Sequence, residues 1–207
     1  MEILLLGFMT GLSLILAIGA QNIFVIEQGL KKNNIFIICL LCSLFDALLI
    51  GLGIFIFHYF LFLSSPIVIL ILNICLVIFL LHFIYQKISK SFGEYKNNNN
   101  EFSKDSIKQS ILKTIGFTFL NPHVYSDTVF FLGNFSKSME IQSKITFGLG
   151  ASFASLIFFF ILGYGAKTVS PYLNNTLAWK IINLFIISFM FLIVCFVSFT
   201  EIYPLIL

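Results

Sequence analysis

The chain has 207 residues, of which 59% are hydrophobic and only 10% are charged, and its formal net charge is +3. A soluble domain carries about 25% charged residues, so this composition excludes a water-soluble fold and leaves the lipid bilayer as the solvent that suits the chain. The basic residues are all lysines, placed in short segments between apolar runs and not on one basic face, which argues against a nucleic-acid partner.

Six apolar segments are long enough to cross a membrane, because a spanning helix needs about 20 mainly apolar residues. They cover residues 3–26, 34–57, 66–85, 111–133, 145–166 and 181–203. The connection at 86–110 contains several lysines and four consecutive asparagines (97–100), which is typical of a soft polar linker. The sequence therefore predicts an all-α integral membrane protein of about six transmembrane helices.

The placement of the lysines predicts the orientation of the chain in the membrane. Most of them lie in or beside the first, third and fifth connections, whereas the fourth connection holds only Lys137 and Lys144 and the second holds none. Cytoplasmic loops carry the excess of lysine. We therefore expect a multi-pass protein of the cell membrane with both termini outside and the 86–110 linker in the cytoplasm.

The linker divides the chain into two groups of three helices, residues 1–85 and 111–207. An odd number of spans in each group makes the second group enter the membrane from the opposite side, as in the inverted repeats of many transporters. Each group has a polar, helix-weakening cluster in its first helix, at residues 19–22 (GAQN) and 121–123 (NPH). The pattern predicts two inverted three-helix repeats with a substrate site where these helices break.

Two acidic residues lie inside apolar segments. Asp46 is near the middle of the second predicted helix, and Asp127 follows His123 by one turn in the fourth, so both of these side chains share one face. A charged side chain at the bilayer centre costs roughly 2.5–3.5 kcal/mol and usually faces a cavity or a partner. We interpret the acids as binding sites for a cationic substrate or a proton; the alternative is a structural interhelical hydrogen bond.

The two polar clusters supply further candidate ligands. Pro122 removes a backbone donor and frees a carbonyl one turn back, and Asn121 can bind loosened backbone groups. A freed carbonyl in a protein-lined cavity is a good ligand for an ammonium group, and Gln21 and Asn22 can serve likewise after Gly19. A kink needed only for packing is the alternative.

The four cysteines, Cys39, Cys42, Cys75 and Cys195, lie inside apolar runs and match neither a disulfide framework nor a zinc site. Cys39 and Cys42 form a C-x-x-C pair, which keeps a membrane thiol–disulfide carrier open as a hypothesis from another functional class. The chain has no phosphate-binding loop and no hydrolase motif, so we expect neither an enzyme nor an ATP-driven pump.

Several motifs resemble the LysE/ArgO family of amino acid exporters. Residues 11–15 (GLSLI) and 17–22 (AIGAQN) resemble the first helix of the family, 46–50 (DALLI) its second, and 121–125 (NPHVY) with 127–128 (DT) its fourth. Matches continue at 28–30, 132–133, 150–152, 162–166 and 178–179, so the resemblance covers nearly all of the chain except the linker and the last helix. The chain departs from the family's pattern at Glu27, where a basic residue is common, and at Asn183, where aspartate is usual.

The resemblance implies export of L-lysine, L-arginine or analogues, driven by protons or by the membrane potential, with no cofactor. It places substrate and ion binding at Gln21, Asn22, Asp46, Asn121, Pro122 and Asp127, and His123 belongs to the same motif. Export of neutral amino acids or related metabolites is the alternative within transporters, and a purely structural membrane subunit is the remaining one. Assembly into a homo-oligomer stays open.

Overall fold

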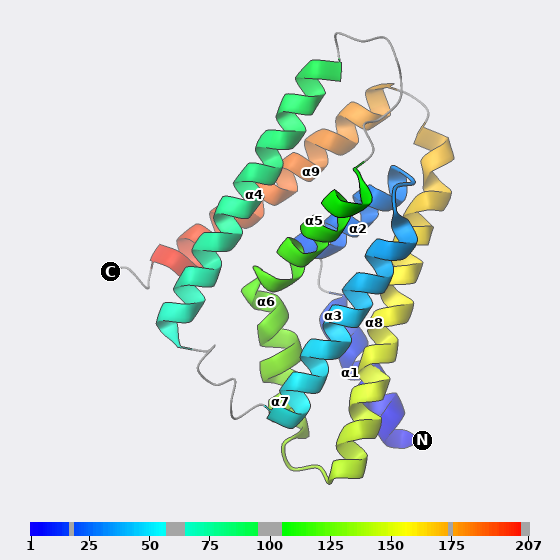
Figure 1. Ribbon diagram of the computed structural model, residues 1–207, viewed down its shortest axis with the longest axis vertical. Coiled ribbons are helices and arrows are strands. Elements are labelled where there is room, and N and C mark those ends of the chain that lie inside the picture. Colours follow the sequence, from blue (N-terminus) through cyan, green and yellow to red (C-terminus); the bar gives the residue numbers. More distant parts are fainter. Residues whose placement is uncertain (17–18, 57–64, 95–104, 174–175, 204–207) are drawn as a thin grey trace.

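The computed structural model describes residues 1–16, 19–56, 65–94, 105–173 and 176–203, and every regular element in these ranges is helical (Figure 1). The four asparagines at 97–100 lie outside the described residues. The first group of expected spans forms the helices α1 (Glu2–Ile15), α2 (Ala20–Leu30), α3 (Ile35–Ile56) and α4 (Pro66–Glu94). Helix α4 is longer than expected and continues into the first part of the predicted linker.

The second group begins with a helix in several pieces. These are α5 (Ile107–Phe119), α6 (Pro122–Tyr125), the π-helix η2 (Ser126–Phe131) and α7 (Leu132–Ser136). The chain then forms α8 (Ile141–Val169), the 3₁₀-helix η3 (Ser170–Leu173), α9 (Thr176–Val197) and the π-helix η4 (Ser198–Ile202).

Four of the described helices are long and apolar enough to cross a membrane, at Ile35–Phe55, Pro66–Ser89, Ile141–Val169 and Lys180–Ile202. Helices α1 and α2, inclined by 84° to each other, make a fifth span if they are counted together. The expected span at 111–133 is divided among α5, α6, η2 and α7. The all-α membrane class is thus confirmed, whereas the count of six spans stays a prediction.

Both breaks fall at the polar clusters, and side chains replace the hydrogen bonds that are lost there. Gly19 is the extended residue that precedes α2, and the Asn22 side-chain nitrogen donates to the Ile15 carbonyl at the end of α1. At the second break Pro122 has no N–H, the Asn121 side-chain oxygen accepts from the His123 N–H, and the Tyr125 hydroxyl donates to the Phe119 carbonyl. The residues around each break therefore stabilise it.

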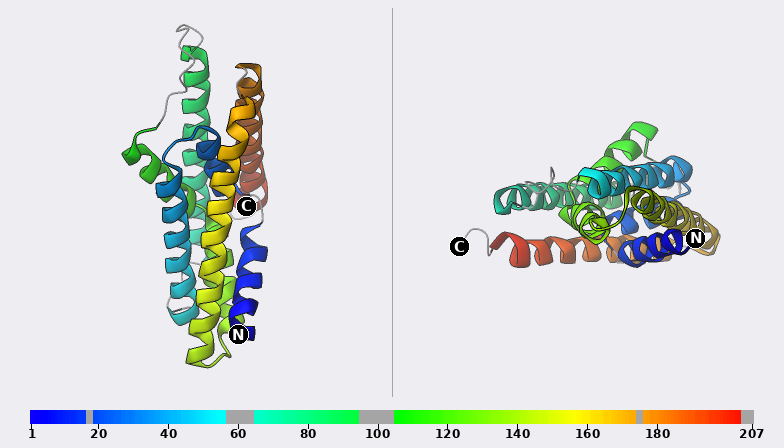
Figure 2. Two further views of the ribbon diagram at one scale, coloured as in Figure 1. Left: turned by 90° about the vertical axis from the view of Figure 1, so that its right-hand side faces the viewer. Right: turned by 90° about the horizontal axis from the view of Figure 1, so that it is seen from below.

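The helices pack around α3 and α8. Helices α1 and α2 pack on α8. The three elements α5, η2 and α7 pack on α3, and α3 itself packs on α8. Helix α4 packs on α9. Seen from below, α4 and α9 extend to one side of the bundle (Figure 2). Helices α1 and α8 touch backbone to backbone, since a Cβ on Gly7 or Gly150 would overlap a carbonyl oxygen of the facing helix.

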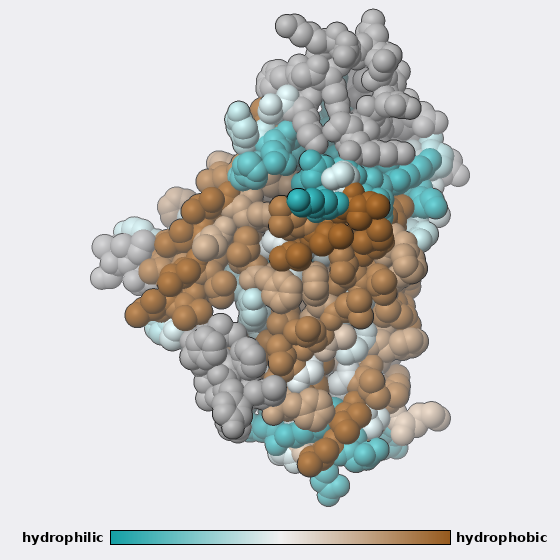
Figure 3. Space-filling model, viewed as in Figure 1, coloured by the Kyte–Doolittle hydropathy of each residue, from teal (hydrophilic) through white to brown (hydrophobic). Residues whose placement is uncertain are grey.

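On the face shown in Figure 3, the most hydrophilic residues gather toward the two ends of the molecule, and a mainly apolar belt lies between them. The α2–α3 turn with Lys31 and Lys32 and the end of α8 with Lys167 lie at one end, which we call the lysine-rich end (Figure 1). The N-terminus and the α7–α8 turn lie at the opposite end. An apolar belt between polar ends is the surface expected in a bilayer; which end faces the cytoplasm stays a prediction.

Candidate functional site

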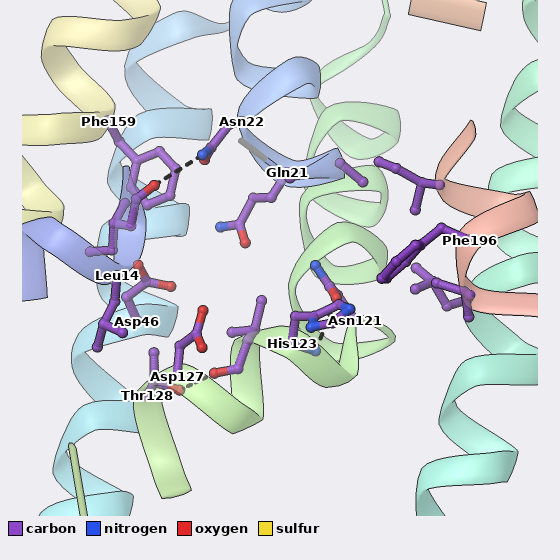
Figure 4. Close-up of a pocket in the computed structure, with 17 residues that line it drawn as sticks. Leu14, Gln21, Asn22, Asp46, Asn121, His123, Asp127, Thr128, Phe159 and Phe196 are labelled. Carbon is purple, nitrogen blue, oxygen red and sulfur yellow. Dashed lines mark hydrogen bonds between the residues drawn. The ribbon is translucent and has the colours of Figure 1, made fainter. Parts of the chain in front are cut away.

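A central cavity of about 420 Å³ lies where the two broken helices meet. Both breaks and the helices α3, α4, α8 and α9 contribute to its wall. Six of the seven predicted site residues line it: Gln21, Asn22, Asp46, Asn121, His123 and Asp127 (Figure 4). The seventh, Pro122, lines a neighbouring pocket of about 220 Å³, which we call the side pocket. The sequence pattern therefore located one site formed by both halves of the chain.

The two acids reach this cavity from different elements. Asp46 of α3 is buried, and its Oδ2 accepts a hydrogen bond of 2.7 Å from the Ser155 hydroxyl of α8. Asp127 is the second residue of η2 and is partly exposed. Figure 4 shows its carboxylate beside that of Asp46. In the described part of the chain no lysine lies within ion-pair distance of either acid. Two acids on one cavity favour a cation or a proton between them.

The start of α2 forms another part of the wall. Gln21 and Asn22 lie in its first turn, where backbone N–H groups have no partner within the helix and the helix dipole is positive. The Gln21 amide points into the cavity and lies beside the Cys42 thiol (Figure 4). Its buried Nε2 has no hydrogen-bond partner among the described residues. This wall suits an anionic group such as a carboxylate.

The second break faces the start of α2 across the cavity. Asn121 is buried, and its side-chain oxygen is used by the His123 N–H. His123 is exposed and lines both the central cavity and the side pocket. Apart from Thr128, whose hydroxyl donates to the Val124 carbonyl, the rest of the wall is apolar and includes the rings of Phe159 of α8 and Phe196 of α9. The site thus combines two acids, amides and a helix start with an apolar surface.

Sequence reasoning missed several residues at or near this site. Ser155 is the partner of Asp46, but a single serine in an apolar helix gives little signal. Asn73 of α4 and Glu201 of η4 line the side pocket. Both carried a usable signal, because an amide or an acid inside an apolar segment needs a polar partner or a cavity.

Between the cavity and the lysine-rich end, buried aromatic rings fill the bundle. Phe24 of α2 stacks on Phe117 of α5 with ring centroids 4.7 Å apart, and Phe83 of α4 packs edge-on against Phe117 at 5.2 Å. Helix α2 carries Phe24 directly after the cavity residues Gln21 and Asn22. We call these three buried rings the aromatic layer; none of them lines the cavity itself.

An ion-pair cluster follows the aromatic layer along α2. The Glu27 Oε1 lies 2.7 Å from the Lys31 Nζ and 3.0 Å from the Lys87 Nζ of α4. Lys87 also donates to the side-chain oxygen of Asn183 of α9 at 3.0 Å. Glu27 is 2% exposed and would be costly to bury without these cations. The cluster therefore ties α2 to α4 and α9.

A second cluster ties the α2–α3 turn to the start of α5. The Asp105 carboxylate lies 2.7 Å from the Lys113 Nζ and accepts from the Gln28 amide at 3.3 Å. The Asn33 and Asn34 side chains both donate to the Asp105 backbone carbonyl. Together with Glu27 and its partners, these residues give the lysine-rich end two polar clusters, and a pocket of about 360 Å³ lies beside Asp105 and Lys113.

Neither cysteine of the C-x-x-C pair lines the cavity, although both contact residues of its wall, Cys39 at Phe159 and Cys42 at Gln21. Cys39 and Cys42 are fully buried, and the Cys39 thiol contacts the Phe159 carbonyl at 3.2 Å. Thiol exchange needs an accessible, ionisable thiol, so this placement does not favour a thiol–disulfide carrier. Among the described residues, no group of three or more His, Cys, Asp or Glu side chains is placed to hold a metal ion.

Comparisons with known proteins agree with the resemblance in the motifs. The model of a family described as LysE type translocator matches residues 12–200. The chain is 36% identical to a protein named YggA from Aeromonas salmonicida over 168 residues, 81% of each chain. It is 36% identical over 195 residues to the arginine exporter protein ArgO of Salmonella paratyphi A, covering 90% of this chain and 89% of that protein. Against ArgO of Klebsiella pneumoniae it is 33% identical over 192 residues, with the same coverage. No solved structure matches.

Proposed function

Because this chain belongs to the LysE type translocator family, we propose that it is a secondary active exporter of basic L-amino acids, lysine or arginine, across the cytoplasmic membrane. The observation that carries the proposal is the central cavity, where two acids that pair with no lysine of the described residues face amides and a helix start. Relatives at 33–36% identity that are named arginine exporters support the substrate class.

The cavity has groups that suit both the cationic side chain and the α-carboxylate of a basic amino acid. Asp46 and Asp127 neutralise a cationic group, since opposite charges attract strongly where water is scarce. The N–H groups at the start of α2 and the Gln21 amide, whose Nε2 has no hydrogen-bond partner among the described residues, bind the α-carboxylate. The methylene groups of the substrate lie against Phe159 and the other apolar residues of the wall.

Two inverted repeats, 1–85 and 111–207, account for the way the helices pack. In these repeats α1–α2 corresponds to α5–α7, α3 to α8, and α4 to α9. The packing of α1–α2 on α8 then corresponds to the packing of α5–α7 on α3. The contacts between α3 and α8 and between α4 and α9 each join two corresponding helices. Each repeat supplies one broken helix to the cavity. Alternating access then consists of movement of one repeat against the other around this site.

The contacts toward the lysine-rich end support an assignment of this conformation within the transport cycle. If that end is cytoplasmic, as the lysines predict, the aromatic layer and the Glu27 cluster lie between the cavity and the cytoplasm. Loading from the cytoplasm then requires α2 and α5 to separate from α4, which breaks the Lys87–Glu27 ion pair.

Export of a cation needs an energy source, because a negative interior opposes it by about 2.3 kcal/mol per charge per 100 mV. Inward movement of protons can exceed this cost. Asp46 is the residue suited to exchange, since it binds either a proton or the cationic substrate and is buried beside only one hydrogen-bond donor, Ser155. A carboxylate that alternates between the two couples their movements in opposite directions.

The test is the Asp46→Asn variant in cells that lack their own exporters. The amide keeps the size of the side chain and can still accept the hydrogen bond from Ser155, but it can neither take up a proton nor neutralise a cationic charge. Export of labelled arginine or lysine is expected to fall at least roughly tenfold, which corresponds to about 1.4 kcal/mol of lost interaction. The control is Glu140→Gln, an exposed acid outside the cavity. Export that stays at the wild-type level would remove Asp46 from the mechanism.

The apolar part of the cavity wall favours a second candidate, an exporter of neutral amino acids or related metabolites. Resistance to toxic analogues separates the two functions. A basic amino acid exporter protects cells against canavanine and thialysine, whereas an exporter of neutral substrates protects only against neutral analogues.

A further inference from the structure

The side pocket contains a buried polar group that the fold leaves unused. Asn73 of α4 is completely buried, and neither its side-chain nitrogen nor its side-chain oxygen has a hydrogen-bond partner among the described residues. An unpaired buried polar group costs about 1–3 kcal/mol. Apolar side chains surround it in α4, where a leucine would cost less. The asparagine is therefore suited to binding something that enters the pocket.

The other polar residues of the side pocket favour a cation. Glu201 of η4 supplies a carboxylate, and Tyr125 and Ser126 supply hydroxyl oxygens. The Tyr125 hydroxyl already donates its proton to the Phe119 carbonyl, so its oxygen is left as an acceptor. Together with the Asn73 oxygen, this is a set of acceptors around one acid. Such a set matches the several N–H donors of a guanidinium or ammonium group.

The side pocket lies next to the central cavity and nearer to the opposite end of the molecule. His123 lines both spaces. Helix α4 begins at the opposite end, and it contributes residues 69–73 to the side pocket but Leu76 to the cavity. Helix α9 runs the other way, contributing 193–197 to the cavity, and η4 contributes Glu201 to the side pocket. A displacement of four residues along a helix is about 6 Å.

We propose that the side pocket is a second binding site for the cationic amino acid, occupied after the central cavity on the way out. This inference rests on the proposed export function. Asn73 and Glu201 bind the cationic group once it has passed His123. The substrate therefore moves from one acidic site to the next, and its positive charge is balanced by a carboxylate at each step. The volume of about 220 Å³ also admits several waters, and hydration of Asn73 without substrate is the competing account.

Equilibrium binding of labelled arginine to the purified chain tests the proposal. We expect two molecules per wild-type chain at saturation. The Asn73→Leu/Glu201→Gln double variant is expected to bind one molecule, in the central cavity. Asp46→Asn is expected to bind one molecule, in the side pocket. Glu140→Gln, which changes an exposed acid outside both pockets, is expected to keep both. A single wild-type site that is lost in Asp46→Asn and kept in the double variant would overturn the second site and leave the export function standing.

Two further outcomes separate the remaining explanations. If the wild-type chain binds neither arginine nor lysine, the proposed function itself fails. The midpoint of thermal unfolding of Asn73→Leu is expected to equal or exceed that of the wild type, because the substitution replaces an unpaired buried amide by an apolar side chain. A lowered midpoint together with lost binding would make Asn73 a structural residue and overturn the proposal.

Discussion

The protein buries acids in two regions, and these regions differ in how the negative charge is balanced. At the lysine-rich end, Glu27 is held by Lys31 and Lys87, and Asp105 by Lys113. Among the described residues, Asp46 of the central cavity has Ser155 as its one hydrogen-bond partner, and Asp127 accepts no hydrogen bond. Each acid of the first region is paired with at least one lysine, whereas no lysine of the described residues pairs with an acid of the second region.

This difference separates residues that stabilise the fold from residues that bind the transported substrate. Removing one member of a buried ion pair leaves an uncompensated charge and is strongly destabilising. Neutralising an acid that has no cation removes a charge that was costly to bury. The comparison therefore predicts opposite effects: substitutions at the lysine-rich end lower stability, and substitutions in the cavity lower transport while the fold persists.

The largest expected effect on stability is that of Lys87→Met. The variant keeps most of the side-chain volume but leaves Glu27, which is 2% exposed, with Lys31 alone. We expect the free energy of unfolding to fall by about 3–5 kcal/mol, measured by thermal unfolding of the purified protein in detergent. Combining Lys87→Met with Glu27→Gln should restore most of the loss, since no acid is then left unpaired. Equal instability of the single and the double variant would break the comparison.

Asp105→Asn is expected to have the next largest effect. It removes the partner of Lys113 and weakens the bond from the Gln28 amide, but the backbone carbonyl that binds Asn33 and Asn34 remains. Because Lys113 is partly exposed and can turn to solvent, the expected loss is about 1–3 kcal/mol. The same unfolding assay measures it. A loss as large as that of Lys87→Met would show that the two clusters act as one unit.

In the cavity, Gln21→Leu is expected to leave stability within about 1 kcal/mol of the wild type, because the Gln21 amide nitrogen has no partner to lose. Transport should nevertheless weaken, with a raised KM for arginine, since the variant removes a donor for the α-carboxylate. Initial rates of arginine export over a concentration series give this value. A variant that unfolds readily but transports with the wild-type KM would place Gln21 in the structural class.

The smallest effect is expected for the Cys39→Ala/Cys42→Ala double variant. Both thiols are buried and neither lines the cavity. The substitutions remove only a little packing volume, so arginine export should stay within about twofold of the wild type. Loss of export with a normal unfolding midpoint would instead support chemistry at the thiols.

The helical breaks and most of the cavity could be predicted from the sequence because their causes are local. Gly19 and Pro122 weaken a helix wherever they occur, and an acid such as Asp46 inside an apolar segment needs a polar environment. Those signals led to six residues that the fold then gathers in one cavity. The role of these residues in binding remains a proposal.

The partners of these residues could not be predicted, because they depend on the relative placement of helices far apart in the sequence. Ser155 lies 109 residues from Asp46, and Lys87 lies 96 residues from Asn183. The division of the fourth expected span, with the π-helix η2 at Asp127, also depends on packing against α3.

Lys87 joins Glu27 and Asn183, two of the positions at which the sequence departs from the motifs that it resembles. The negative charge beside Lys87 is supplied by Glu27 of α2. This common partner could not be predicted from the sequence, because α2, α4 and α9 are far apart along the chain.

Counterflow of labelled arginine by the purified protein in liposomes tests the central claim most directly, with the wild type and Asp46→Asn compared at equal reconstitution. The account predicts that the wild type exchanges arginine and lysine, and that Asp46→Asn loses this exchange while its unfolding midpoint stays at or above the wild-type value. Exchange by Asp46→Asn at the wild-type rate would contradict it.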